Sequence, residues 1–453
     1  MESNTVAAKA PEEQQSALEK KALNASFWSI LEYGSGMGLR VVSSLVLTRL
    51  LAPVYFGQMT LVTTLIVGIN LLSDIGLAPS VIQSPRGDDP DFLNTAWTIQ
   101  ILRGVALMGV ALMICWPMAI FYHEPELKFL LPVLALSTLL GGFNSTNLLS
   151  LSRHLAVRRL FFIDGSMYLL SLVVTIAWAY FRPSVWAIIA GQVISTIYRL
   201  VISHVPALTP GIKNKFHWDK DAIHSIVHFG KWILIGTAFF FFASQADRLI
   251  LARLVSFAML GIYGLAYSLS DIPRAIILAL SNRVAYPFVS KMIHMPMEEF
   301  REKFFHYRFY MLLVGASLLS VMVTWGHLII IHLYDRRYHD AAWMIPILAL
   351  GLWHTLLYQT TAPVLFSLGK PRYNAMGNAA YCIAMLVGLP LAFHFWGMFG
   401  AVIAIAAGDL PLYLVIQAGA TREGVKPLLQ DLKMTAVFAG ILSFCLFLRH
   451  AIG

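Results

Sequence analysis

The apolar runs of this sequence carry a few charged residues, and these side chains are the best candidates for chemistry. Asp247 and Arg248 stand near the end of one run, and Asp271 and Arg274 stand inside the next. A charge at the centre of a membrane-spanning helix costs about 2.5–3.5 kcal/mol on insertion scales. Charged residues in such helices usually face a bundle interior or a water-filled cavity, so we expect the same of these four.

The basic residues inside the apolar runs are suited to binding an anion. Arg40, Arg103 and Arg274 lie within apolar runs, and arginine presents a planar, permanently charged fork that matches phosphate. Glu32 precedes Arg40 by eight residues, about 80° around a helix and ~12 Å along it, so both can line one cavity. We predict that these four residues form a substrate-binding cavity. For Arg274 the alternative is a structural ion pair with Asp271, three residues earlier.

Charged residues of the second half are candidates either for ion coupling or for structure: Asp247, Arg248, Asp271 and Asp409. Proton or sodium coupling could use Glu32, Asp271 or Asp409, and a structural role is the alternative. His354 and His394 are single imidazoles in apolar runs. Such residues are more often buried hydrogen-bonding groups than proton carriers.

The motifs of the common enzyme classes are absent from the sequence. It contains no Walker loop, no HExxH and no GxSxG, and Cys115, Cys382 and Cys445 each stand alone. We therefore expect no catalytic residue, no metal site and no bound cofactor.

Composition places the chain among polytopic α-helical membrane proteins. Apolar residues make up 58% of the 453 residues and charged residues 13%, proportions that a soluble chain of this size cannot arrange around one core. The net charge of +9 does not indicate a nucleic-acid partner, because Lys and Arg of such proteins collect on cytoplasmic loops. Their distribution over alternate loops predicts a cytoplasmic N-terminus.

The order of apolar runs predicts two six-helix bundles and one extra C-terminal helix. The predicted runs are 24–50, 55–82, 93–121, 127–150, 161–181, 184–205, 228–253, 260–290, 308–333, 342–366, 374–395, 399–420 and 434–450. The predicted parts are a cytoplasmic N-terminal segment 1–23, a bundle 24–205, a cytoplasmic linker 206–227, a second bundle 228–420, and a cytoplasmic loop with the extra helix at 421–453.

The two bundles carry matching residues at a constant offset of 204. Trp28, Leu47, Arg49, Leu50 and Gly57 correspond to Trp232, Leu251, Arg253, Leu254 and Gly261. Coincidence among apolar helices is one explanation. The other is a pseudo-two-fold repeat around a central cavity, an architecture common in transporters.

Five stretches resemble the polysaccharide transporter, or oligosaccharide flippase, family of bacteria: Thr48–Gly57, Asp74–Leu77, Gln245–Leu251, Leu260–Tyr267 and Tyr286–Lys291. The resemblance covers nearly the whole chain. It implies a member of the multidrug/oligosaccharidyl-lipid/polysaccharide exporter superfamily that works by alternating access. The expected substrate is an undecaprenyl-pyrophosphate-linked oligosaccharide moved across the bacterial inner membrane for surface polysaccharide synthesis. The run at 434–450 departs from a twelve-helix plan.

The expected partners are the lipid-linked oligosaccharide and membrane lipids, with a polysaccharide polymerase and co-polymerase as further candidates. Two other functions stay open on the sequence. A multidrug or cation antiporter of the same superfamily would favour unpaired acids in its cavity. An integral-membrane glycosyltransferase or polymerase would normally need a large outer loop with catalytic acids, and the predicted outer loops are short.

Overall fold

The computed structural model describes residue 28 and residues 31–32, 34–74, 76–280 and 295–452. Every regular element in this part of the chain is helical. Among the described residues, eight helical segments are long and apolar enough to cross a membrane, with Arg372–Arg422 counted as one, or nine if one bent pair counts as a span. The all-α polytopic class is thereby confirmed. The segment 1–23 and the stretch Tyr286–Lys291 lie outside the described residues.

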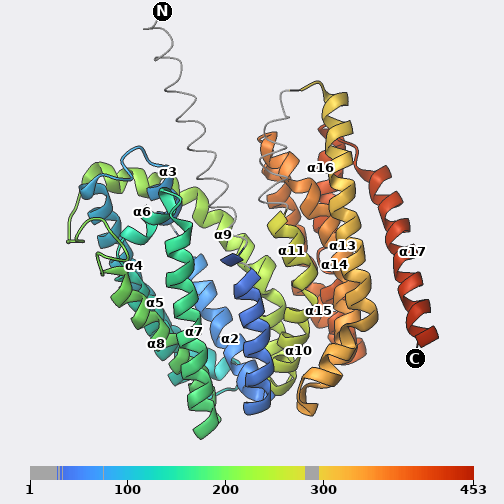
Figure 1. Cartoon of the computed structure of the whole chain (residues 1–453), viewed down its shortest axis with the longest axis horizontal. Coiled ribbons are helices and arrows are strands. Elements are labelled where there is room, and N and C mark those ends of the chain that lie inside the picture. Colours follow the sequence, from blue (N-terminus) through green and yellow to red (C-terminus); the bar gives the residue numbers. More distant parts are fainter. Residues whose placement is uncertain (1–27, 29–30, 33, 75, 281–294, 453) are drawn as a thin grey trace, which may run out of the picture. The chain divides into compact units, whose positions relative to one another are not determined.

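The chain divides into two compact units (Figure 1). The N-terminal unit comprises Met1–Leu51 and Leu65–Thr237, and the C-terminal unit comprises Ala52–Thr64 and Ala238–Gly453. The division differs from the predicted bundles because helices α2 (Pro53–Leu71) and α9 (Lys220–Leu254) each contribute to both units. A pseudo-two-fold relation between two six-helix bundles stays a prediction.

The N-terminal unit is a helical bundle in which two of the predicted runs are broken. Residues 34–50 are helical. The helices that follow α2 are α3 (Leu77–Gln83), α4 (Pro90–Phe121), α5 (Leu127–Gly142), α6 (Asn147–Arg153), α7 (Val157–Phe181) and α8 (Val185–Ser203). Gly76, at φ 61°, separates α2 from α3, and α5 and α6 meet at an angle of 67°. These two breaks leave polar backbone ends inside the bundle.

The C-terminal unit contains the second half of α9 and the later helices. These are α10 (Phe257–Ser270), α11 (Ile272–Leu280), α13 (Met297–Leu333), the 3₁₀ turn η2 (Arg336–Tyr338), α14 (Ala341–Ser367), α15 (Arg372–Ala407), α16 (Leu410–Arg422) and α17 (Leu428–Ile452). Helix α15 is interrupted at Gly397 (φ 58°, ψ −144°). The 51 residues Arg372–Arg422 would measure ~76 Å as one straight helix, far beyond a bilayer core of about 30 Å, so the break separates two spans.

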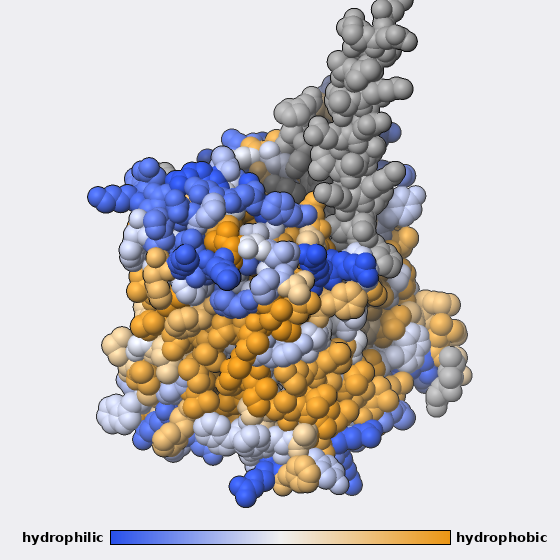
Figure 2. Space-filling model, turned by 60° about the vertical axis from the view of Figure 1, so that its left-hand side comes forward, coloured by the Kyte–Doolittle hydropathy of each residue, from blue (hydrophilic) through white to orange (hydrophobic). Residues whose placement is uncertain are grey.

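The surface has the character expected of a protein in lipid. Figure 2 shows a hydrophobic band across one face, with hydrophilic residues gathered above and below it. Large apolar side chains of α4 and α7 are exposed in the structure, including Trp116 and Phe181. Lipid tails can cover such side chains at no cost, whereas water cannot.

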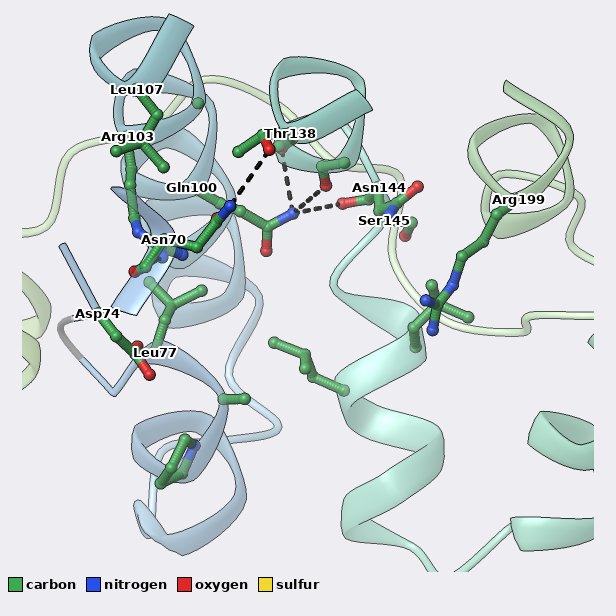
Figure 3. A pocket seen from close by; sticks show the side chains of 17 residues that line it. Asn70, Asp74, Leu77, Gln100, Arg103, Leu107, Thr138, Asn144, Ser145 and Arg199 are labelled. Atoms are coloured by element: carbon green, nitrogen blue, oxygen red, sulfur yellow. Dashed lines mark hydrogen bonds between the residues drawn. The ribbon is translucent and has the colours of Figure 1, made fainter. Parts of the chain in front are cut away.

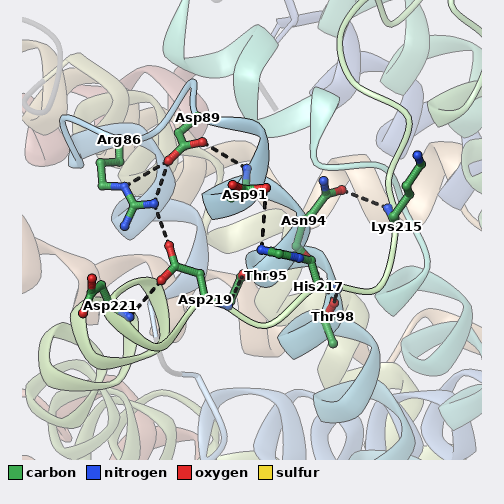
Figure 4. A network of polar contacts seen from close by, with 10 residues as sticks. All are labelled: Arg86, Asp89, Asp91, Asn94, Thr95, Thr98, Lys215, His217, Asp219 and Asp221. Atoms are coloured by element: carbon green, nitrogen blue, oxygen red, sulfur yellow. Dashed lines mark hydrogen bonds and ion pairs between the residues drawn. The ribbon is translucent and has the colours of Figure 1, made fainter.

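The predicted linker 206–227 is irregular only as far as Asp219, because α9 begins at Lys220. Its early start has a packing reason: Ala222 and Ile226 are buried against an apolar cluster that includes Leu77 and Phe92. The irregular part lies along α4 (Figure 4). Side chains of α4 accept hydrogen bonds from linker backbone N–H groups, pairing Asn94 with Lys215, Thr98 with His217 and Thr95 with Asp219.

Helices α2 and α10 cross at two glycines within the C-terminal unit. A Cβ atom on Gly57 would overlap the backbone oxygen of Phe257, and one on Gly261 would overlap that of Pro53. Phe257 and Gly261 stand 204 residues after Pro53 and Gly57, so the two halves of this contact are equivalent under the sequence repeat. A self-complementary contact of this kind is what a two-fold axis produces, which supports the predicted repeat at this place.

Candidate functional site

Five of the predicted site residues belong to the C-terminal unit, where tyrosines lie between them. The phenol of Tyr267, on α10, interacts electrostatically with four charged side chains: Asp247, Arg248, Asp271 and Arg274. The phenol of Tyr381, on α15, interacts electrostatically with both Asp247 and Asp409. The helices thus gather charged residues that are far apart in sequence into one polar cluster.

Asp247 and Arg248 have separate partners at one end of this cluster. Tyr263 donates a hydrogen bond of 2.5 Å to Oδ2 of Asp247, which is buried. Arg248 donates from Nη1 to Gln245 Oε1 at 2.6 Å and places its guanidinium 5.3 Å from the centre of the Tyr267 ring. Arg248 therefore makes a cation–π contact and a hydrogen bond within the unit.

Asp271 and Arg274 form a two-pronged ion pair. Arg274 donates from Nε to Asp271 Oδ1 at 2.5 Å and from Nη2 to Oδ2 at 2.7 Å. This is the geometry of the structural alternative raised from the sequence. A paired guanidinium is a weaker anion site than a free one, because the carboxylate already neutralises its charge.

Asp409 meets two side chains of α14. Its Oδ2 accepts a hydrogen bond of 2.6 Å from Thr355, and its Oδ1 faces Nε2 of His354. His354 and Asp409 are 13% and 16% exposed, so the pair is largely shielded. The sequence interpretation of His354 as a buried hydrogen-bonding group missed this partner, because the two residues come from helices far apart in the chain.

In the N-terminal unit, Arg103 caps the end of α2. Its Nε donates to the backbone oxygen of Ser73 at 3.0 Å, and its Nη2 donates to that of Asn70 at 2.8 Å. The last carbonyls of a helix have no intrahelical partner and carry partial negative charge, so a guanidinium stabilises them. Arg40 is exposed and Glu32 is partly exposed. The cavity that would unite these residues with Arg274 stays a prediction.

A cavity of about 390 Å³ lies beside Arg103 (Figure 3). It is lined by Asn70, Asp74, Leu77, Ala78, Pro79, Gln100, Arg103, Gly104, Leu107, Thr138, Gly141, Gly142, Asn144, Ser145, Leu148, Leu149 and Arg199. The breaks after α2 and α5 make room for it, since residues from both breaks line the wall. Of this polar lining, the sequence interpretation had identified only Arg103 as a site residue. Amide side chains such as Gln100, inside an apolar run, were the available signal.

The described residues contain no group of three or more His, Cys, Asp or Glu side chains that could hold a metal ion.

Sequence comparison relates the chain to proteins of polysaccharide biosynthesis. A family model described as polysaccharide biosynthesis protein matches residues 46–343. The lipopolysaccharide biosynthesis protein WzxC of Escherichia coli (strain K12) is 22% identical over 339 residues, which are 74% of this chain and 67% of that protein. Alignments to four further relatives cover 53% to 64% of those proteins.

Comparison with solved structures relates the fold to known transporters. An inward-facing multidrug resistance MATE family transporter of the MOP superfamily superposes with a TM-score of 0.66 at 12% identity, over 88% of this chain and 95% of that one. The lipid II flippase MurJ, in an inward closed conformation, gives a TM-score of 0.64 at 11% identity, over 95% and 98%. At these identities the likeness establishes the fold and leaves the cargo to be argued from the site.

Proposed function

The chain belongs to the polysaccharide biosynthesis protein family, and we propose on that premise that it is a flippase for lipid-linked oligosaccharides. It moves an undecaprenyl-pyrophosphate-linked repeat unit from the cytoplasmic to the outer leaflet of a bacterial inner membrane by alternating access. The product serves the synthesis of a surface polysaccharide, such as exopolysaccharide, capsule or O-antigen. The N-terminus is cytoplasmic, and a polymerase and co-polymerase act on the flipped unit.

One observation carries the proposal: a family match over 46–343 coincides with polar groups buried among apolar, membrane-length helices. A pyrophosphate-linked sugar cannot cross hydrocarbon unshielded. A helical bundle with hydrogen-bonding side chains in its interior provides the required shield.

The antiporter alternative is less well supported by the site. A cation-exporting cavity needs unpaired acids, whereas Asp271 is paired with Arg274 and Asp409 faces His354. The enzyme alternative is less well supported, because the sequence contains none of the common enzyme motifs and its predicted outer loops are short.

For energy coupling, the proposal assigns Asp409 and His354 as the proton-exchanging pair. Asp409 is one of the acids that the sequence raised for ion coupling, and His354 is the side chain that its Oδ1 faces. Changing Asp409 to Asn should abolish the dependence of transport on a proton gradient, while downhill flipping continues. Unchanged gradient dependence would contradict this assignment.

The test of the function has a cellular and a reconstituted arm. Deleting the gene should stop export of the polysaccharide, with lipid-linked repeat units accumulating on the cytoplasmic leaflet. Purified protein in liposomes should make fluorescently tagged lipid-linked oligosaccharide accessible to an external glycosidase. Normal polymer with altered drug sensitivity would favour the antiporter and contradict the proposal.

A further inference from the structure

Helix α17 is firmly attached to its neighbours over its first half. Asp431 pairs with the buried Arg308 of α13 at 2.6 Å. Further along, Thr435 accepts a hydrogen bond of 2.9 Å from Trp353 of α14. The Trp353 ring also stacks on the ring of Phe438, with 4.6 Å between the centroids. Two polar contacts and one ring stack therefore bind this half of α17 to two different helices.

The second half of α17, residues 439–452, has much weaker contacts. Cys445 is its only buried residue in the part of the chain that the structure describes. Among the described residues it makes one hydrogen bond to α13, from Nη1 of Arg449 to the backbone oxygen of Thr324, at 3.4 Å. A hydrogen bond of that length is weak. The helix is therefore anchored at one end and loosely held at the other.

The side of α13 that this half covers carries polar atoms without a partner. Ser320 and Thr324 are both 0% exposed, and neither side-chain hydroxyl forms a hydrogen bond within the described chain. The two residues are four positions apart and so lie on one side of α13. Arg449 bonds the Thr324 backbone and interacts electrostatically with His327, one turn further on, which places α17 over that side. Buried polar atoms without partners are costly, and native proteins contain few of them.

Apolar packing does little to compensate for these hydroxyls. Helices in lipid gain no hydrophobic driving force from contact, because lipid tails are as apolar as the side chains that they replace. Two of the largest side chains of the second half, Phe444 and Phe447, are 61% and 68% exposed and so contribute little packing. Water entering between the two helices would satisfy both hydroxyls of α13. The balance of these effects favours separation of the second half.

We propose that residues 439–452 form a hinged strap, which separates from α13 and admits water to Ser320 and Thr324 while the first half of α17 stays anchored. The hinge lies after Phe438, where the ring stack with α14 ends. Gly440 follows directly, and a glycine inside a helix permits bending more readily than other residues. Nothing lies within 4 Å of a Cβ atom added there. This motion goes beyond the proposed flippase function and can be measured without a substrate.

Cys445 is a native reporter of this motion. Its thiol is buried while the strap is closed, and a maleimide reacts only with a thiolate that water and reagent can reach. The assay uses the full chain in nanodiscs, with Cys115 and Cys382 changed to Ser. The matched control is Met434→Cys combined with Cys445→Ser, because Met434 is also buried on α17, at 1% exposed, but lies in the anchored half. Each labelling rate is divided by the rate of the same thiol in unfolded protein.

We expect the thiol at position 445 to be labelled at least tenfold faster than the thiol at position 434. Arg449→Leu removes the hydrogen bond to α13, so the rate at Cys445 should rise at least threefold. Ser320→Ala combined with Thr324→Val removes the unpartnered hydroxyls, so the closed arrangement is favoured and the rate should fall at least threefold.

Ser317→Ala is the control for the double variant on α13. The Ser317 hydroxyl is exposed and already donates to the backbone oxygen of Leu313, so its loss should leave the rate at Cys445 unchanged. Equal rates at positions 445 and 434 would overturn the proposal. A rate at Cys445 that neither Arg449→Leu nor the double variant changes would also overturn it. If the double variant does not fold, Arg449→Leu and the position 434 control decide between the outcomes.

Discussion

Among the described residues of the C-terminal unit, several charged side chains inside the helices have a specific partner, and one deeply buried pair shows why. Arg308 of α13 and Asp431 of α17 are 1% and 2% exposed and meet at 2.6 Å. Arg308 also donates to Thr360 and to the backbone oxygen of Leu357, both on α14. A buried charge without a partner would cost several kcal/mol, so this network fixes α17 against its neighbours.

For Asp271 and Arg274 the partnership predicts an asymmetric mutational effect. Arg274→Gln should strand the Asp271 carboxylate in a shielded site and lower the amount of folded protein, at a cost of about 1–3 kcal/mol. The double change with Asp271→Asn should restore abundance, because no charge is left unpaired. Fluorescence size-exclusion chromatography of both variants measures this, with flipping assayed in parallel. Recovery of abundance and flipping together would assign Arg274 to structure, and abundance without flipping would assign it to the cargo.

At the scale of elements, the crossing of α2 and α10 depends on two glycines. Gly57→Ala and Gly261→Ala each place a methyl group on a backbone oxygen of the facing helix. The helices must separate, and we expect a loss of about 1–3 kcal/mol in stability. Gly109→Ala on α4 is the control, because nothing lies within 4 Å of its added Cβ. Thermal unfolding in detergent measures the effect. Equal melting temperatures for all three variants would show that this contact does not form.

The linker before α9 is held by a charged contact at the start of α4 (Figure 4). Arg86 donates to Asp89 at 2.7 Å and to Asp219 at 2.6 Å. The hydrogen bond from Arg86 holds the pKa of both carboxyls below the ordinary value. A carboxyl whose pKa is lower in the folded than in the unfolded state stabilises the folded state at pH values above its unfolded pKa of about 3.9. This contribution is lost as the pH falls through the pKa of the folded state.

We therefore expect the linker to become more mobile at acid pH and in the variant Asp219→Asn. The mobility of a spin label on residue 213 should stay low from pH 7 to pH 5 and rise below about pH 4. Asp219→Asn should raise the mobility of this spin label at pH 7. Asp221→Asn should not, because Asp221 contributes only its backbone N–H to this contact. Equal mobility in the two variants would show that Arg86 does not hold the linker.

At the scale of the whole molecule, the sequence predicts on which side of the membrane each loop lies. Three predicted spans separate Lys215 from Asp340, so single cysteines at these positions should face opposite sides. An impermeant maleimide applied to intact cells should label position 340 and leave position 215 unlabelled until the membrane is opened. Labelling of both positions from outside would contradict the predicted span count and the cytoplasmic N-terminus.

The membrane class, the position of most spans and the family resemblance follow from the amino-acid sequence alone. Span length is a local property, because a backbone in lipid must satisfy its own hydrogen bonds and so forms a helix wherever an apolar run is long enough. The break between the runs 374–395 and 399–420 was predictable for the same reason. It lies at Gly397, whose positive φ favours glycine.

Which polar side chains meet could not be predicted from the sequence and depends on how the helices pack. His354 and Asp409 lie 55 positions apart, and Arg308 and Asp431 are separated by 123. No periodicity along one helix determines which face of another helix it contacts. The cavity beside Arg103 depends in addition on two helix breaks, after α2 and after α5, whose angles follow from packing. Pairing and cavity shape are properties of helix packing, and packing depends on all the helices at once.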